Sequence, residues 1–327
     1  MAALIAIALL VVGIFALTGG GETPLPGSTG SPTGGVAGQG MTVVRIDPAT
    51  NRVAGTIGVR QGASAVAIGH GSVWVANTDD DSVSRVNPAT GQVQATIRVG
   101  NSPRGIAAAD GIPGVWVITL NGLWGIDPLT DDVDATIRLP QVPTAVAVGG
   151  DAVWVTTGRQ FETGPGLFRI DPVTKALVRG IVTTPGFGAH PDVEYGEGVV
   201  WVLEPNTAGG NPGTIIRVDP LTGDTRHVHL GPGAPIDLAV EEGSVWVLFS
   251  NGIVSRIDPQ TEETVARIGT ENGATGITVG GGAVWVVNPL QGTLTRIDPQ
   301  SNSVVAVIAV GKGTGVAADQ SGVWVTR

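Results

Sequence analysis

A repeat of about forty residues constrains the fold of this chain more strongly than any other sequence feature. Each repeat contains one Trp-Val pair, and the seven tryptophans are Trp74, Trp116, Trp154, Trp201, Trp246, Trp285 and Trp324. Each repeat also contains an aspartate or asparagine followed by proline, and these residues are Asp47, Asn87, Asp127, Asp171, Asp219, Asp258 and Asp298. Both series recur every 38 to 48 residues. Such periods are typical of solenoids, propellers and related arrays.

Four short stretches of alternating β-branched residues fit into each repeat. In the last complete repeat they are Ala274–Val279, Ala283–Val287, Leu294–Asp298 and Val304–Ile308. Alternation with period two, interrupted by Gly, Asn and Asp-Pro, predicts short antiparallel strands. Seven units of four strands predict an all-β fold, a seven-bladed β-propeller of four-stranded antiparallel blades.

The two ends of the repeat region complement each other. The repeats begin at Thr42 with only the third and fourth strands of a unit, and they finish after Gly315 with only the first and second. We therefore expect the last blade to be closed by both termini, which would leave no open sheet edge.

The repeated Asp and Trp residues have structural explanations. Aspartate before proline accepts hydrogen bonds from backbone N–H groups two or three residues later, which fixes a tight hairpin. The tryptophans are expected to fill the wedge between neighbouring blades. One unit differs: it has Gly125 where the other six carry arginine, and an additional Trp124 precedes it. We expect the Trp124 ring to cover the site that the aliphatic stem of the arginine covers in the other units.

The N-terminal segment has a different composition. Residues 2–18 are uncharged and almost entirely apolar, which predicts a hydrophobic helix preceding the propeller, either a transmembrane anchor or a signal-like segment. We favour an anchor. Residues 19–41 are rich in Gly, Pro, Ser and Thr and are predicted to form a flexible linker. The propeller is predicted to occupy residues 42–327.

Charge and cysteine content exclude several classes of function. The formal net charge is −10 and the chain has no cysteine. Acidic proteins lack the basic face that nucleic acids require, so no nucleic-acid partner is expected. Disulfides, thiolate metal sites and cysteine nucleophiles are also excluded.

The repeat motif resembles that of the YncE-like, YVTN-type bacterial seven-bladed propellers. The segments Trp74–Asn77 and Trp285–Asn288 stand where that family has Tyr-Val-Thr-Asn, and the resemblance covers residues 42–327. It implies a propeller that works outside the cytoplasm, so we expect a membrane-anchored protein of the cell envelope. The chain is more distantly similar to streptogramin-lyase and NHL-type propellers, but no catalytic motif of the lyase can be carried over.

The candidate site consists of polar departures from the repeat in the fourth complete unit and the loops beside it. Its residues are Arg159, Glu162, His190, Asp192, Glu194 and Glu204. Polar side chains clustered on loops at one face of a propeller are a pointer to binding. No cofactor is required by the sequence, although oxygen ligands with one histidine would suit Mg²⁺ or Ca²⁺. The alternative is an irregular, solvated blade.

These observations favour a monomeric, membrane-tethered recognition or sensor module that binds an unknown protein or small molecule and performs no catalysis. The alternative is a divalent-metal-dependent enzyme of the lyase or lactonase type, with its site near the propeller axis. A third interpretation is a domain of a longer membrane-anchored receptor.

Overall fold

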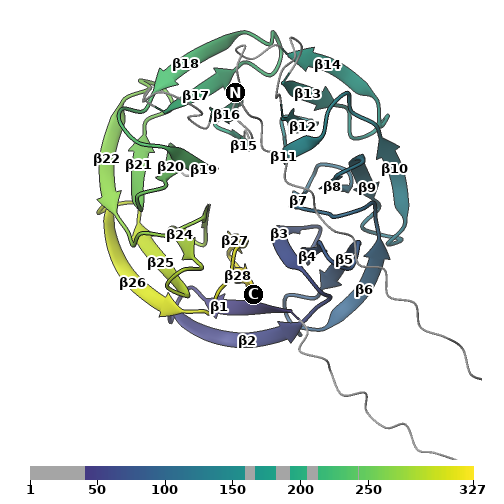
Figure 1. The fold of residues 1–327 in the computed structure, drawn as a ribbon, viewed down its shortest axis with the longest axis horizontal. Helices are drawn as coiled ribbons and strands as arrows, with labels where there is room; N and C mark the ends of the chain where they lie inside the picture. Colours follow the sequence, from purple (N-terminus) through teal and green to yellow (C-terminus); the bar gives the residue numbers. More distant parts are fainter. Residues whose placement is uncertain (1–40, 159–165, 182–191, 205–212, 242) are drawn as a thin grey trace, which may run out of the picture. The chain divides into compact units, whose positions relative to one another are not determined.

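The structure is a computed structural model, and it describes residues 41–158, 166–181, 192–241 and 243–327, apart from the loop at 205–212. Seven sheets of four antiparallel strands stand around a central axis (Figure 1). This confirms the predicted all-β fold of seven four-stranded blades. The described residues contain no helix that is long and apolar enough to cross a membrane. The helix predicted at 2–18 lies outside them.

Six blades are built from consecutive strands, which follow one another from the axis outward. Blade 1 contains β3 (Ala63–Gly69), β4 (Ser72–Asn77), β5 (Ser82–Val86) and β6 (Val93–Arg98). Blade 2 contains β7 (Gly105–Ala107), β8 (Val115–Thr119), β9 (Gly122–Ile126) and β10 (Val133–Ile137). Blade 3 contains β11 (Pro143–Gly149), β12 (Ala152–Thr157), β13 (Leu167–Ile170) and β14 (Leu177–Ile181).

The next three blades follow the same pattern. Blade 4 contains β15 (Asp192–Gly196), β16 (Val199–Glu204), β17 (Thr214–Val218) and β18 (Thr225–His229). Blade 5 contains β19 (Pro235–Glu241), β20 (Ser244–Phe249), β21 (Ile253–Ile257) and β22 (Thr264–Gly269). Blade 6 contains β23 (Gly276–Gly280), β24 (Ala283–Asn288), β25 (Thr293–Asp298) and β26 (Ser303–Ala309).

Blade 7 joins the two ends of the propeller, as predicted. Its order from the axis outward is β27 (Val316–Asp319), β28 (Gly322–Thr326), β1 (Thr42–Asp47) and β2 (Arg52–Gly58). The backbone groups of Thr42 and Arg327 exchange two hydrogen bonds of 2.7 Å each. The first and last strands of the repeat region therefore pair, which closes the ring and removes a free sheet edge.

The core lies between the blades. All seven repeat tryptophans stand on the second strand of their blade and are fully buried, so the predicted packing role is confirmed. In five blades an arginine of the third strand lies over the tryptophan of its own blade, at 5.2–5.8 Å from the ring centroid. A cation over an aromatic face is attracted by the negative charge of the ring face.

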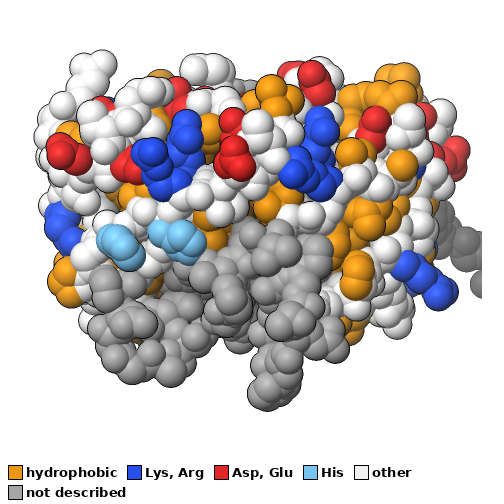
Figure 2. All heavy atoms as spheres, turned by 90° about the horizontal axis from the view of Figure 1, so that it is seen from above, with side chains coloured by type: hydrophobic (Ala, Val, Ile, Leu, Met, Phe, Trp, Pro, Cys, Tyr) orange, Lys and Arg blue, Asp and Glu red, His pale blue; other side chains and the backbone are white. Residues whose placement is uncertain are grey.

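Three of these arginines also reach the turn of the next blade. Arg85 contacts Asp131 at 3.0 Å, Arg256 contacts Asn302 at 3.1 Å, and Arg296 contacts Asn51 at 2.8 Å. Figure 2 shows basic and acidic side chains side by side along one rim of the visible face. The contacts of Arg85, Arg256 and Arg296 connect consecutive blades on the side of the Asp-Pro turns.

Blade 2 departs from this pattern. Gly125 pairs with Trp116 in the register where the other blades place arginine, and the ammonium of Lys175 from blade 3 lies 4.9 Å from the Trp116 ring centroid. The expectation that Trp124 supplies this cover is wrong. Successive side chains of a strand point to opposite faces, so Trp124 lies on the other face of its sheet from residue 125 and packs with Ile97 and Val99 of blade 1.

The Asp-Pro turns form as the sequence predicts. In all seven, the side-chain oxygen of the Asp or Asn accepts a hydrogen bond from the N–H group two residues later. At Asp258 the two bonds, from Gln260 and Thr261, measure 2.7 and 3.0 Å. These bonds lower the pKa of the Asp258 carboxyl below its ordinary value. The repeated aspartates are therefore structural.

Candidate functional site

Only part of the predicted site lies within the described residues. Arg159, Glu162 and His190 lie outside them. Glu204 ends strand β16, and only its backbone is described. Asp192 and Glu194 are described, and both stand on β15, the inner strand of blade 4. The structure thus brings two of the six predicted residues to the inner edge of one blade.

Asp192 and Glu194 line a cavity of about 320 Å³ on the axis of the propeller. Every blade contributes to its wall with the beginning of its inner strand, at residues 64–66, 104–106, 144–146, 192 and 194, 236–237, 275–277 and 314–316. The inner strands all begin on the side of the ring where the chain crosses from one blade to the next. The cavity therefore opens among the connecting loops, on the face where the sequence predicts a binding site.

The strand register shows why the cavity is acidic on one side. Asp192 pairs with the residue two positions after Trp201, and Asp237 stands in the same relation to Trp246 on blade 5. At this position the other five blades carry only small residues, which are Ala65, Gly105, Ala145, Gly276 and Gly315. Two adjacent blades thus place a carboxyl group where the repeat leaves space.

The two aspartates are fixed by backbone hydrogen bonds. Asp192 accepts a bond of 2.8 Å from the N–H group of Val193. Asp237 accepts one of 2.9 Å from its neighbour Leu238 and one of 2.7 Å from Ile277 on blade 6. The two carboxyl groups also influence each other's ionisation.

Burial dominates the ionisation of these carboxyl groups. Burial raises the pKa of Asp192. Burial, followed by the charge of Asp192, raises the pKa of Asp237 well above its ordinary value. Burial and the Asp192 charge also raise the pKa of Glu194 to about 8. Each side chain keeps some contact with water in the cavity, but the inner strands remove most of its hydration, which disfavours the charged form.

A basic residue completes the polar wall. Arg104 precedes β7 and lines the same cavity from blade 2, which stands across the axis from blade 5 (Figure 1). Within the described residues, no carboxylate forms an ion pair with the Arg104 guanidinium. The cavity thus has carboxyl groups on one side and a guanidinium on the other.

The described residues contain no group of three or more His, Asp or Glu arranged to hold a metal ion. The metal hypothesis also includes His190 and the side chain of Glu204, which lie outside the described part of the chain. The hypothesis of a Mg²⁺ or Ca²⁺ site stays a prediction.

Sequence reasoning missed Asp237 and Arg104. Asp237 carries a usable signal: aligning the units on their tryptophans places it with Asp192, at a position of Ala or Gly in the other five. Arg104 has a weaker signal, since it precedes its strand and its direction depends on the path of the connecting loop. Both residues become part of the site only because the ring brings distant inner strands together.

Comparisons with known proteins show the fold and not the function. No family model and no curated protein matches the chain. Among solved structures, hydrazine synthase from Kuenenia stuttgartiensis contains a similar chain, with a TM-score of 0.67 and 14% sequence identity over 80% of this chain and 90% of that chain. At this identity the similarity supports the propeller fold alone. The resemblance to the YncE-like family remains a prediction.

Proposed function

We propose that this protein is a binding propeller that takes a small dipolar ligand into its axial cavity. The observation that carries the proposal is the placement of three carboxyl groups and one guanidinium in the wall of one cavity. A positively charged amino group would be held by Asp192, Glu194 and Asp237, and an anionic group by Arg104. Cavities of about 300 Å³ or more are of the size that holds small molecules, so a ligand of amino-acid size fits the volume.

The raised carboxyl pKa values support this ligand class. A desolvated carboxyl group without a cation is more stable when protonated, whereas an ammonium group beside it favours the charged form. Binding of a cation would therefore complete the site and release protons. An arginine can hold a carboxylate with two parallel hydrogen bonds, which would orient the other end of the ligand.

A thermal-shift series tests this proposal with the full-length chain. L-lysine is the dipolar probe, cadaverine lacks its carboxylate and hexanoate lacks its amines. We expect L-lysine to raise the Tm in proportion to its affinity, cadaverine to act more weakly and hexanoate to have no effect. Asp237→Asn and Arg104→Gln should each abolish most of the shift. Asp298→Asn, at a turn, is the matched control and should preserve it.

The proposal fails if no probe raises the Tm. It also fails if cadaverine and L-lysine raise the Tm by the same amount, both in the unmodified protein and in Arg104→Gln. The second result would leave a cation site without a dipolar ligand.

We also propose that residues 2–18 tether the propeller to a membrane outside the cytoplasm, where it acts as a recognition or sensor module. The uncharged apolar segment and the linker at 19–41 support this proposal. Membrane fractionation of cells that produce the full chain tests it. Recovery of the protein in the soluble cytoplasmic fraction would contradict it.

The enzymatic alternative uses the same cavity. A carboxyl group with a pKa near 8, such as Glu194, keeps its proton at neutral pH and suits a general acid. Metal-dependent lyase or lactonase chemistry would further require Mg²⁺ or Ca²⁺ beside the described carboxyl groups. A Tm raised by either ion and lowered again by EDTA would favour this alternative.

A further inference from the structure

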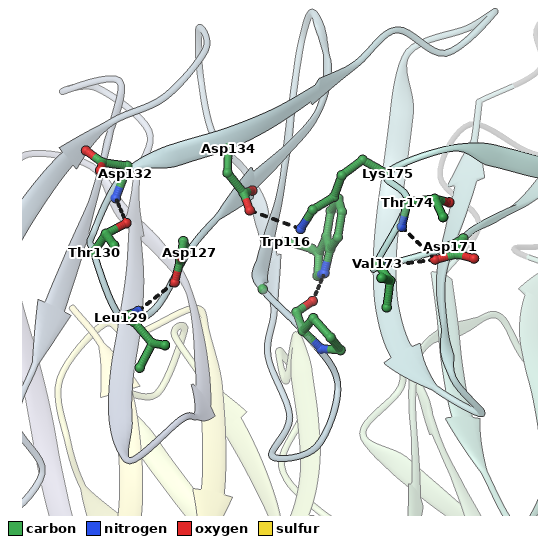
Figure 3. A network of polar contacts seen from close by, with 12 residues as sticks. Trp116, Asp127, Leu129, Thr130, Asp132, Asp134, Asp171, Val173, Thr174 and Lys175 are labelled. Carbon is green, nitrogen blue, oxygen red and sulfur yellow. Dashed lines mark hydrogen bonds and ion pairs between the residues drawn. The ribbon is translucent and has the colours of Figure 1, made fainter.

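A second cavity, of about 460 Å³, lies on the opposite side of the ring, among the Asp-Pro turns. Its walls come from three consecutive blades, with His70 and Arg85 of blade 1, Asp127–Leu129 of blade 2 and Lys175 of blade 3. Figure 3 shows Leu129 and Val173 on the turns that flank the contact between Asp134 and Lys175. This cavity is separate from the axial site.

The cavity coincides with departures from the repeat. Position 125 is glycine, and an arginine there would extend toward Asp134 and Trp116, because the nearest atoms of these residues lie 3.1 and 3.3 Å from an added Cβ. Lys175 occupies this space in part, over Trp116 and 3.2 Å from Asp134. The connection between β7 and β8 spans residues 108–114, whereas blades 1 and 3 use two-residue turns there.

The wall of the cavity is apolar where it meets solvent. Leu129 is 90% exposed, although it is a large aliphatic side chain beside a hollow. Pro113 and Pro128 continue this apolar wall. The equivalent turn residues of the next two blades, Val173 and Leu221, are 71% and 81% exposed. A ligand that fills only the cavity would leave these two uncovered, whereas a polypeptide chain could cover the row.

The charge around the cavity indicates the chemistry of its occupant. The arginine and lysine of its wall, Arg85 and Lys175, are already paired with Asp131 and Asp134. Asp127 lines the hollow, Asp132 lies on the same turn and accepts the backbone hydrogen bond of Asp127, and Asp110 accepts a hydrogen bond from the backbone of His70 in the wall. None of these three aspartates forms an ion pair within the described part of the chain. The rim therefore carries an excess of negative charge and attracts a cationic partner.

We propose that this cavity is a docking site for a polypeptide segment that carries a bulky apolar side chain flanked by lysine or arginine. The apolar side chain enters the hollow beside Leu129, and the flanking cations face the aspartates of blade 2. Val173 and Leu221 extend the contact along the rim. An apolar anchor in a pocket surrounded by polar contacts is the usual arrangement of an energetically important interface residue.

Fluorescence anisotropy with the full-length chain and a labelled peptide, Lys-Arg-Leu-Arg-Lys, tests the proposal. Two comparison peptides replace the central Leu by Ser or all four cations by Glu. We expect binding of the first peptide only, weakened by added salt because the charges are exposed. Leu129→Ser should weaken binding about tenfold, which corresponds to the removal of one buried leucine contact. Asp132→Asn should weaken it about threefold.

The matched control is Leu290→Ser. Leu290 is also an exposed leucine, 70% exposed, but it lies in the connection between β24 and β25, away from the cavity. Both positions are exposed, so neither substitution should disturb the fold, and circular dichroism checks this. Equal loss in the two variants, equal binding of the Ser-centred peptide, or no binding at about 1 mM peptide would each overturn the proposal. Asp237→Asn, at the axial cavity, should not change peptide binding.

Discussion

Several turn aspartates and the carboxyl groups of the axial cavity lie in the same protein, and their pKa values are shifted in opposite directions. The exposed Asp258 accepts backbone hydrogen bonds that stabilise its charge, so its pKa is lowered. Burial raises the pKa of Asp192, and burial together with the charge of Asp192 raises the pKa of Glu194 and Asp237. A repeated aspartate stabilises the fold, whereas an aspartate that departs from the repeat is held at a cost in stability. That cost is the reason to look for function in the cavity.

The strongest test of this comparison is the pH dependence of stability. Between about pH 4.5 and 8, the folded protein keeps a proton on Glu194 that the unfolded chain has released. The free energy of unfolding therefore falls as the pH rises through this range. A rise of the pKa from 4.5 to about 8 corresponds to about 5 kcal/mol, and the contact of Glu194 with water in the cavity reduces this to an amount on the order of 3 kcal/mol. Urea denaturation at several pH values measures this fall. Glu194→Gln should remove the part of the fall that is due to this carboxyl group and leave the part due to Asp192 and Asp237. An unchanged slope would assign the whole titration to the two aspartates.

A smaller effect is expected at the paired aspartates. Asparagine at position 192 removes one of two interacting charges and keeps a hydrogen-bonding side chain. Asp192→Asn should therefore raise the free energy of unfolding at about pH 8 by roughly 1 kcal/mol. Asp132→Asn, at an exposed turn, is the control and should change it little. Destabilisation by Asp192→Asn would show that the charge of this aspartate supports the fold. It would contradict the statement that the aspartates of the cavity are held at a cost in stability.

The smallest effect is expected at a single turn. Asp258→Ala removes the acceptor for two backbone N–H groups and should lower the Tm by a few degrees at neutral pH. Because the folded pKa lies below the unfolded value of 3.8, the stabilisation by the charge is present above that pH and is lost as the pH falls through the folded pKa. Asp258→Asn should behave almost like the natural turn at Asn87. Calorimetry at neutral and acidic pH separates the variants.

The fold was predictable from local sequence patterns. The strands of the last complete repeat were predictable from alternating residues, and β24 begins at Ala283 as expected. The closure of blade 7 followed from counting the partial units at Thr42 and Gly315. The replacement of the usual arginine over Trp116 by Lys175 was not predictable. Lys175 belongs to blade 3 and reaches the Trp116 ring only across the contact between blades 2 and 3.

The sequence by itself determined the number of blades, the strands within each blade, the buried tryptophans and the chemistry of the turns. These features depend on contacts within one repeat, and such contacts recur wherever the pattern recurs. Only the tertiary structure brought Asp237 and Arg104 to the cavity with Asp192 and Glu194, and placed Leu129 beside a hollow shared by three blades. Those arrangements depend on how separate blades face one another around the axis, which no pattern within a single repeat encodes.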